Sequence, residues 1–264
     1  MPLNVQTETV RLHRSALVRF GSLNHLKARS CLATVLNILL QAWHCYCRGM
    51  QEFEEDVRIL RLLKPGLPER PVIFDVGASN GRWTREIVKI FPGATVFLFE
   101  PGTAYTDEMR ATLDSHDRLK LFPIAIGERD GPVTFHVHPD PLGSTTVDWQ
   151  EGNFATPITV PMRTIDSLIK EGAIPPPDLI KMDIQAGELP ALKGAIGALP
   201  RVRVLHLETW IMQAYGGKIP LLADLMLFLR PLRFRLFDLG TQFRTDTGAL
   251  YSIDACFVNE NFSF

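Results

Sequence analysis

The strongest constraint on the fold of this chain is the segment Pro71–Gly81, PVIFDVGASNG. A short apolar run ends in Asp75, a glycine turn follows, and a helical pattern begins directly after it. The next apolar run, Thr95–Phe99, is followed by a second acid, Glu100. A strand that passes through a glycine turn into a helix places ligand-binding groups at the carboxyl edge of a parallel sheet. The spacing therefore predicts a nucleotide-type cofactor site at this edge.

The alternation of apolar runs and helical segments continues along the chain and predicts a parallel α/β sheet. Strands are expected at 72–76, 95–99, 119–124, 179–182 and 202–207, and helices at 82–91, 103–116, 188–199 and 219–230. Connections between such parallel strands are right-handed. The final apolar runs, 234–239 and 251–258, are joined by a polar turn with no room for a helix. These two strands should therefore pair antiparallel.

Residues 127–163 interrupt this rhythm. Strands are expected at 133–137 and 158–162, with a Gly/Ser/Thr loop at 143–146 between them. The pattern predicts an antiparallel excursion or flap. The loop is interpreted either as a cover over an acceptor site or as an ordinary surface turn. A short helix is expected at 164–170, before the sheet pattern resumes.

The first part of the chain shows only helical patterns, without the alternating strands of the rest, so two regions are predicted. Residues 1–64 form an N-terminal helical extension with apolar faces at 32–40 and 53–63, and residues 65–264 form the α/β domain. Pro65 and Gly66 end the second of these helices, which places the boundary there. The extension is a candidate surface for a homodimer, a cap over the acceptor pocket, or a docking site for a carrier protein.

Net charge, cysteine content and hydrophobic segment lengths indicate the cellular environment and the partners of the protein, but not its reaction. The formal net charge is −1, so the charge gives no indication of nucleic-acid binding. The four cysteines show no metal-type pair spacing, which favours reduced thiols in a cytoplasmic protein and no metal. The apolar segment 31–47 is shorter than the roughly 20 residues of a spanning helix, so a packed helix is expected and no stable membrane span.

The two acids suggest which nucleotide the site takes. Glu100 at the end of the second strand can accept both hydroxyls of a ribose, and Asp75 can face an ammonium group. A dinucleotide site expects G-x-G-x-x-G, but no third glycine follows Gly81. A cationic nucleoside that carries an amino acid is therefore favoured over a nicotinamide dinucleotide. A nicotinamide-dependent oxidoreductase stays as the alternative enzyme class, and a glycine turn without a ligand as the plain structural alternative.

Five motifs together resemble the FkbM family of S-adenosylmethionine-dependent methyltransferases. They are DVGASNG from Asp75, FEP from Phe99, AIG from Ala125, VPMRTIDSL from Val160 and KMDIQAGELPALKG from Lys181. The resemblance runs from about Pro71 to about Glu208. It implies the class I methyltransferase fold, a Rossmann-like, doubly wound seven-stranded sheet with an antiparallel last strand. It also implies S-adenosylmethionine as the cofactor and a small hydroxylated acceptor such as a metabolite, a sugar or a natural product.

The resemblance also implies roles for individual residues. The turn would surround the methionine part of the cofactor, Glu100 would hold the ribose beside Pro101, and Asp183 would face the transferred methyl group. Ile124 and Ala125 would lie near the adenine. The turn residues are Asp75, Gly77, Ala78, Ser79, Asn80 and Gly81.

Two positions depart from the family pattern. Ser79 stands where the family usually has asparagine. The family usually has glycine directly after the position of Gln185, but here Ala186 comes first and Gly187 follows it. If the turn needs a positive φ at position 186, alanine costs about 1 kcal/mol there. Otherwise the turn has shifted by one residue. These departures are the sequence support for a third class of function, a non-catalytic scaffold that keeps the fold.

An alcohol acceptor loses its proton during methyl transfer, so a base at a strand end is expected. Asp183 is the first candidate because it lies nearest the predicted methyl group, although it can equally serve as a cofactor or turn ligand. His206 and Glu208 are two positions apart and share one face of a strand. Glu208 is expected to enter the pocket, whereas the deeper His206 is also interpreted as a core histidine.

Overall fold

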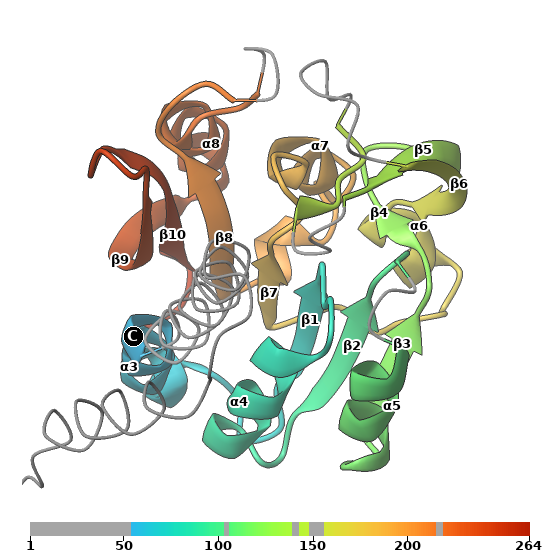
Figure 1. The fold of residues 1–264 in the computed structure, drawn as a ribbon. Helices are drawn as coiled ribbons and strands as arrows, with labels where there is room; N and C mark the ends of the chain where they lie inside the picture. The colour runs from blue at the N-terminus through green and yellow to red at the C-terminus, as the bar shows by residue number, and fades with distance from the viewer. Residues whose placement is uncertain (1–53, 103–105, 139–142, 148–155, 215–218) are drawn as a thin grey trace, which may run out of the picture. The chain divides into compact units, whose positions relative to one another are not determined.

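The computed structural model describes residues 54–102, 106–138, 143–147, 156–214 and 219–264 (Figure 1). The helical face expected at 32–40 and the apolar segment 31–47 lie outside the described residues. Residues 52–264 form one compact unit. Among the described residues, no helix is both long and apolar enough to cross a membrane.

The unit is built on a seven-stranded sheet with the order β3-β2-β1-β7-β8-β10-β9 (Figure 1). The strands are β1 Val72–Val76, β2 Thr95–Phe99, β3 Leu119–Phe122, β7 Leu179–Met182, β8 Val204–Trp210, β9 Phe234–Arg244 and β10 Leu250–Asn259. The pairs from β3 to β8 are parallel, whereas β10 runs antiparallel to both β8 and β9. The expected doubly wound sheet and its antiparallel final pair are confirmed.

Helices cover both faces of the sheet, and each face has its own hydrophobic core. One face carries α3 Glu54–Leu63, α4 Arg82–Ile90 and α5 Thr106–Asp114, and the other carries α6 Ile165–Lys170, α7 Glu188–Lys193 and α8 Leu222–Leu229. Strand residues alternate between the two cores, so Ile73 packs on the first face and Phe74 on the second. The helix α3, which the sequence assigned to the extension, packs against α4 and β9.

One expected helix is shorter than its sequence pattern suggested. The helix α7 ends at Lys193 rather than continuing to 199, and a 3₁₀ turn follows at Leu199–Arg201. At Gly194 the backbone of another segment comes very close, since a Cβ added there would lie 2.1 Å from the carbonyl oxygen of Gly127. Tertiary contact therefore overrides local propensity at this point.

The interruption at 127–163 forms a second, three-stranded sheet with the order β4-β6-β5. Its strands are β4 Ala125–Ile126, β5 Gly131–Val137 and β6 Thr156–Arg163, and β5 pairs antiparallel with β6. The loop that holds Thr145 returns to this sheet, where Thr145 and His136 exchange backbone hydrogen bonds. The expected excursion is confirmed, and it stands beside the carboxyl edge of the main sheet.

Candidate active site

The glycine turn after β1 is shaped by its close approach to β7. Gly77 has φ +76°, and a Cβ there would lie 1.9 Å from the carbonyl oxygen of Asp183. Gly81 has φ +75°, and a Cβ there would lie 2.7 Å from Oγ1 of Thr112. Both positions require glycine for backbone reasons. Backbone packing alone therefore accounts for both glycines, and the side chains around the turn are what distinguish a ligand site.

A pocket opens at this edge, between the main sheet and the excursion. Predicted cofactor residues that line it are Gly77, Ser79, Glu100, Pro101, Ile124, Ala125 and Asp183. The excursion contributes Phe135 and the polar loop residues Ser144, Thr145 and Thr146, and the turn after β7 contributes Ile184 and Gln185. The lining thus combines apolar side chains with hydroxyl, amide and carboxylate groups.

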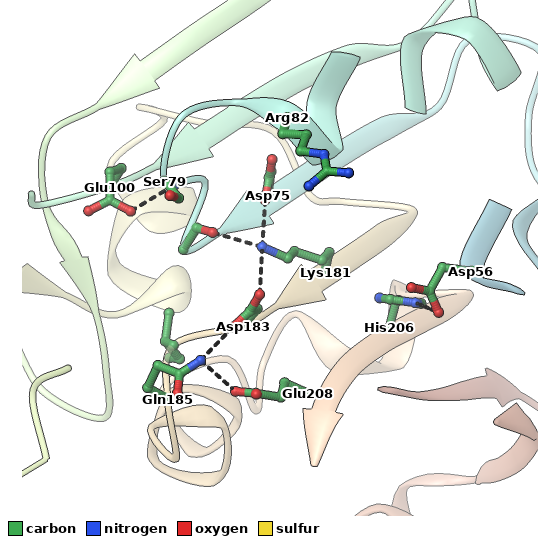
Figure 2. Close-up of polar contacts among 12 residues, drawn as sticks. Asp56, Asp75, Ser79, Arg82, Glu100, Lys181, Asp183, Gln185, His206 and Glu208 are labelled. Atoms are coloured by element: carbon green, nitrogen blue, oxygen red, sulfur yellow. Dashed lines mark hydrogen bonds and ion pairs between the residues drawn. The ribbon is translucent and has the colours of Figure 1, made fainter. Parts of the chain in front are cut away.

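Glu100 is held in a fixed orientation at this pocket (Figure 2). Its Oε2 accepts a hydrogen bond from the backbone N–H of Ser79 at 2.8 Å, and its Oε1 accepts one from Gly102 at 2.7 Å. Burial raises the pKa of Glu100, and the two backbone N–H groups act against this shift. Each carboxylate oxygen keeps a second acceptor site, so the group can take two hydroxyl donors of a ligand.

The side chain and backbone of Ser79 indicate whether a polar cofactor fits at the glycine turn. Its Oγ is buried and has no hydrogen-bond partner among the described residues, and its backbone is left-handed with φ +49°. A buried hydroxyl without a partner costs about 1–3 kcal/mol. Both the strain and the unsatisfied hydroxyl are typical of a ligand site. The residues present therefore fit a nucleoside with a polar tail at the turn.

Asp75 does not line the pocket. Its side chain is fully buried, its Oδ1 lies 3.1 Å from Nζ of Lys181, and its Oδ2 accepts a hydrogen bond from Thr84 at 2.6 Å. We expected this acid to face an ammonium group of the ligand, and the structure instead provides the ammonium of Lys181. The reason is strand register, because Asp75 and Lys181 are directly paired on neighbouring parallel strands.

Lys181 joins the two strand ends that form the site (Figure 2). Its Nζ donates to the carbonyl oxygen of Gly77 at 2.7 Å and lies 3.8 Å from Oδ2 of Asp183. Burial acts to lower the pKa of Lys181, but the carboxylates of Asp75 and Asp183 raise it overall. This role of Lys181 was not among the roles expected from the sequence. A signal was present, since Lys181 is the charged residue in the otherwise apolar run LIKM.

The remaining predicted turn residues shape the backbone rather than the pocket wall. Ala78 is buried, and Oδ1 of Asn80 accepts a hydrogen bond from the backbone N–H of Arg82 at 3.1 Å. Gly81 precedes the first residue of α4. Direct contact of these three residues with the cofactor stays a prediction.

Of the three candidate bases, the structure brings one into the pocket. Asp183 is exposed and lines it, and Nε2 of Gln185 donates to Oδ1 of Asp183 at 3.2 Å and to Oε2 of Glu208 at 3.0 Å (Figure 2). Glu208 is buried, and burial together with Asp183 raises its pKa well above the usual range. His206 is also buried, and its Nε2 lies 3.2 Å from Oδ1 of Asp56. A catalytic role for Glu208 or His206 stays a prediction without support from the pocket lining.

The turn after Asp183 resolves the second departure from the family pattern. Gln185 and Ala186 both have positive φ, +54° and +74°, whereas Gly187 has φ −87°. The turn has therefore not shifted, and alanine occupies the left-handed position. Two hydrogen bonds hold the turn, from Oγ1 of Thr145 to the Gln185 carbonyl at 2.8 Å and from the Ile184 N–H to Glu188 at 2.8 Å. Burial raises the pKa of Glu188 to about 8.

Replacing Ala186 with glycine should stabilise the protein by about 0.5–1 kcal/mol. The left-handed conformation costs an alanine about 1–2 kcal/mol, and the greater freedom of glycine in the unfolded chain removes part of the gain. Urea unfolding measures the change. The matched control is Ala191→Gly in α7, which should destabilise by about 1 kcal/mol. Equal losses in both variants would show that the turn at 186 carries no strain.

The sheet order, the glycine turn and the pocket at its carboxyl edge together define a class I methyltransferase. The chain belongs to the FkbM methyltransferase family, because the family model "Methyltransferase FkbM domain" matches residues 75–236. The family resemblance and S-adenosylmethionine as the cofactor are thereby confirmed. The match decides against the nicotinamide-dependent oxidoreductase.

Two curated relatives and one solved structure illustrate the similarity. The 2-O-methyltransferase NoeI of Sinorhizobium fredii is 30% identical over 171 residues, which cover 59% of this chain and 70% of the relative. The hexuronic acid methyltransferase AglP of Haloferax volcanii is 29% identical over 157 residues, covering 59% of this chain and 62% of the relative. The crystal structure of methyltransferase FkbM from Methylobacillus flagellatus KT is 21% identical, with a TM-score of 0.48, and the match covers 71% of this chain and 44% of that one.

Proposed function

We propose that this enzyme transfers a methyl group from S-adenosylmethionine to a hydroxyl group of a sugar, with a hexuronic acid as the first candidate. The observation that carries the proposal is the exposed carboxylate of Asp183, which lines the same pocket as the hydroxyl groups of the excursion loop. The names of the two curated relatives support it, since one is a 2-O-methyltransferase and the other a hexuronic acid methyltransferase.

In this proposal different pocket residues contact different parts of the cofactor. Glu100 would accept the ribose hydroxyls, with Pro101 beside it, and the hydroxyl of Ser79 would meet the polar methionine end. Ile124 and Ala125 would form the apolar surface for the adenine. When bound, S-adenosylmethionine supplies a methyl group that its sulfonium already activates. Asp75 would act indirectly, because it fixes the ammonium of Lys181, which in turn holds the Gly77 carbonyl.

Asp183 would act as the base in this scheme. A sugar hydroxyl is a weak nucleophile, and a carboxylate within hydrogen-bond reach can accept its proton as the new bond forms. The amide of Gln185 donates to Oδ1 of Asp183, while Oδ2 faces Lys181. These contacts orient the carboxylate. The hydroxyl groups of Ser144 and Thr146 line the same pocket and can contact other hydroxyls of the acceptor.

Replacing Glu100 with glutamine should weaken binding of S-adenosylhomocysteine by about 10–100-fold. The reason is the loss of hydrogen bonds to a charged acceptor, each worth about 1.5–3 kcal/mol. Isothermal titration measures the affinity, and thermal unfolding checks that the variant is folded. The matched control is Glu86→Gln, whose carboxylate forms a surface ion pair with Lys89. Equal affinities in wild type and Glu100→Gln would remove Glu100 from the cofactor site.

The acceptor is tested with labelled S-adenosylmethionine and a set of hexuronic acid glycosides, neutral hexosides and their deoxy analogues. We expect label in the hydroxylated sugars and none in the analogue that lacks the target hydroxyl. The product should survive mild alkali, because an ether is stable there and a methyl ester is hydrolysed. An alkali-labile product, or label only in amine acceptors, would contradict hydroxyl methylation.

We also propose that the protein acts in the cytoplasm and that the part of residues 1–64 that precedes α3 mediates a homodimer. Light scattering of the full chain tests the second point, and a monomer at micromolar concentration would contradict it.

A further inference from the structure

A second group of ionisable side chains lies outside the methyl-transfer pocket, where α3 covers the strands β8 and β10. Asp56 comes from the first turn of α3, His206 from β8 and Asp254 from β10. One ligand atom from each of these residues lies within 4.8 Å of the others. Figure 2 shows the Asp56 carboxylate facing the His206 ring, away from the contacts around Lys181 and Gln185.

The histidine of this group is buried without a hydrogen bond at the nitrogen that faces the acids. His206 is 3% exposed, and its Nε2 lies 3.2 Å from Oδ1 of Asp56. Apart from this short contact with Asp56, Nε2 has no hydrogen-bond partner among the described residues. An unsatisfied buried nitrogen is costly. One cation can coordinate two ligand atoms that lie this close together, because each then lies about 2.0–2.2 Å from it.

The carboxylate of Asp56 is held in its orientation by neighbouring residues on β9. Its Oδ2 accepts a hydrogen bond from the Thr241 hydroxyl at 2.8 Å, and its Oδ1 accepts one from the Thr241 N–H at 3.2 Å. The β9 backbone approaches so closely that a Cβ on Gly240 would lie 1.9 Å from Oδ1. Hydrogen bonds that fix a ligating carboxylate are a regular feature of metal sites.

Several acidic side chains come together at this place. Asp56 and Asp254 contribute two carboxylates, and Glu208 is the direct register partner of Asp254 on the neighbouring strand. The ammonium of Lys181 is engaged by Asp75 and the Gly77 carbonyl. Buried carboxylates are stable when they are paired or coordinate a metal.

We propose that Asp56, His206 and Asp254 bind one divalent transition-metal ion, with Zn²⁺ as the best match. One imidazole nitrogen with two carboxylate oxygens suits Zn²⁺, whereas Mg²⁺ prefers oxygen ligands throughout. Asp254 is partly exposed, which provides a path of entry. The ion would connect α3 to two strands of the sheet, so its role is structural and it takes no part in methyl transfer.

The test uses the full chain, stripped with a chelator and then dialysed against Zn²⁺ or Mg²⁺. We expect one Zn²⁺ per chain by elemental analysis, no comparable binding of Mg²⁺, and a rise in Tm of about 5–10 °C at a hundredfold excess of Zn²⁺ over its Kd. X-ray absorption should show only nitrogen and oxygen neighbours, at about 2.0–2.2 Å.

The diagnostic variant is Asp254→Asn, and the matched control is Asp238→Asn, an acid on β9 that pairs with Arg58 of α3 outside the group. Asp254→Asn should weaken Zn²⁺ binding by more than the ~10–100-fold typical of losing a ligand's hydrogen-bond partner. The control should bind like wild type. No Tm shift in wild type, sulfur neighbours in the absorption spectrum, or equal binding by Asp254→Asn and wild type would each overturn the proposal. The first two readouts need no variant, so the test holds even if Asp254→Asn fails to fold.

Discussion

Replacing Asp183 with asparagine is expected to lower kcat by about 10²- to 10⁴-fold, the range that a positioned general base contributes. Asparagine keeps the size of the side chain and one acceptor oxygen, so Gln185 can still donate to it. It cannot accept the hydroxyl proton of the acceptor. Affinity for S-adenosylhomocysteine should therefore change little, while turnover at saturating substrate falls.

Steady-state kinetics and isothermal titration separate the two roles that Asp183 can have. The matched control is Asp107→Asn, because Asp107 is 95% exposed in the first turn of α5 and does not line the pocket. It should retain full activity. If Asp183→Asn instead loses cofactor affinity in proportion to its activity, Asp183 is a cofactor ligand and the base must be sought elsewhere.

Replacing Lys181 with methionine is expected to destabilise the protein by about 3–5 kcal/mol, the cost of leaving a buried charge without its partner. The side chain of Lys181 is 7% exposed and that of Asp75 is fully buried, so water cannot replace the lost ammonium. The Gly77 carbonyl also loses its donor, and the cofactor turn should loosen. For a domain of this size, the Tm should fall by about 10 °C.

A double variant, Asp75→Asn with Lys181→Met, provides the control for this result. Removing both charges leaves no uncompensated ion, and asparagine can still accept the hydrogen bond from Thr84. The double variant should therefore recover much of the lost stability, as measured by urea unfolding. If the double variant instead loses as much stability as the two single variants together, Asp75 and Lys181 do not act as a pair.

The sheet and much of the pocket wall could be predicted from the sequence because both depend on local patterns. Short apolar runs bounded by turns predicted the strands, and the residues that follow them, such as Glu100 and Asp183, lie at the same edge of a parallel sheet. The antiparallel pairing of β9 with β10 followed from the length of the turn alone. The family motifs then placed Ser79 and Ile124 at the wall they line.

The contacts that could not be predicted join residues far apart in the chain. Lys181 and Gly77 are 104 positions apart, and their contact depends on the register between β1 and β7. Asp75 was assigned to the ligand because its partner was not visible without that register. The hydrogen bond from Thr145 to Gln185 likewise depends on where the excursion returns. Sequence periodicity carries no information on such distances.

The way the excursion is attached has a consequence for how this enzyme can diversify. Its first and last strands are neighbours, with Ala125 opposite Met162 and Ile126 opposite Arg163. The excursion thus begins and ends on neighbouring strands of its own sheet, and lengthening a loop between them adds little closure entropy. The part of the pocket wall that comes from the chain between β5 and β6 can therefore change in length and in side chains, while the β4–β6 pair and the glycine turn on the main sheet stay unchanged.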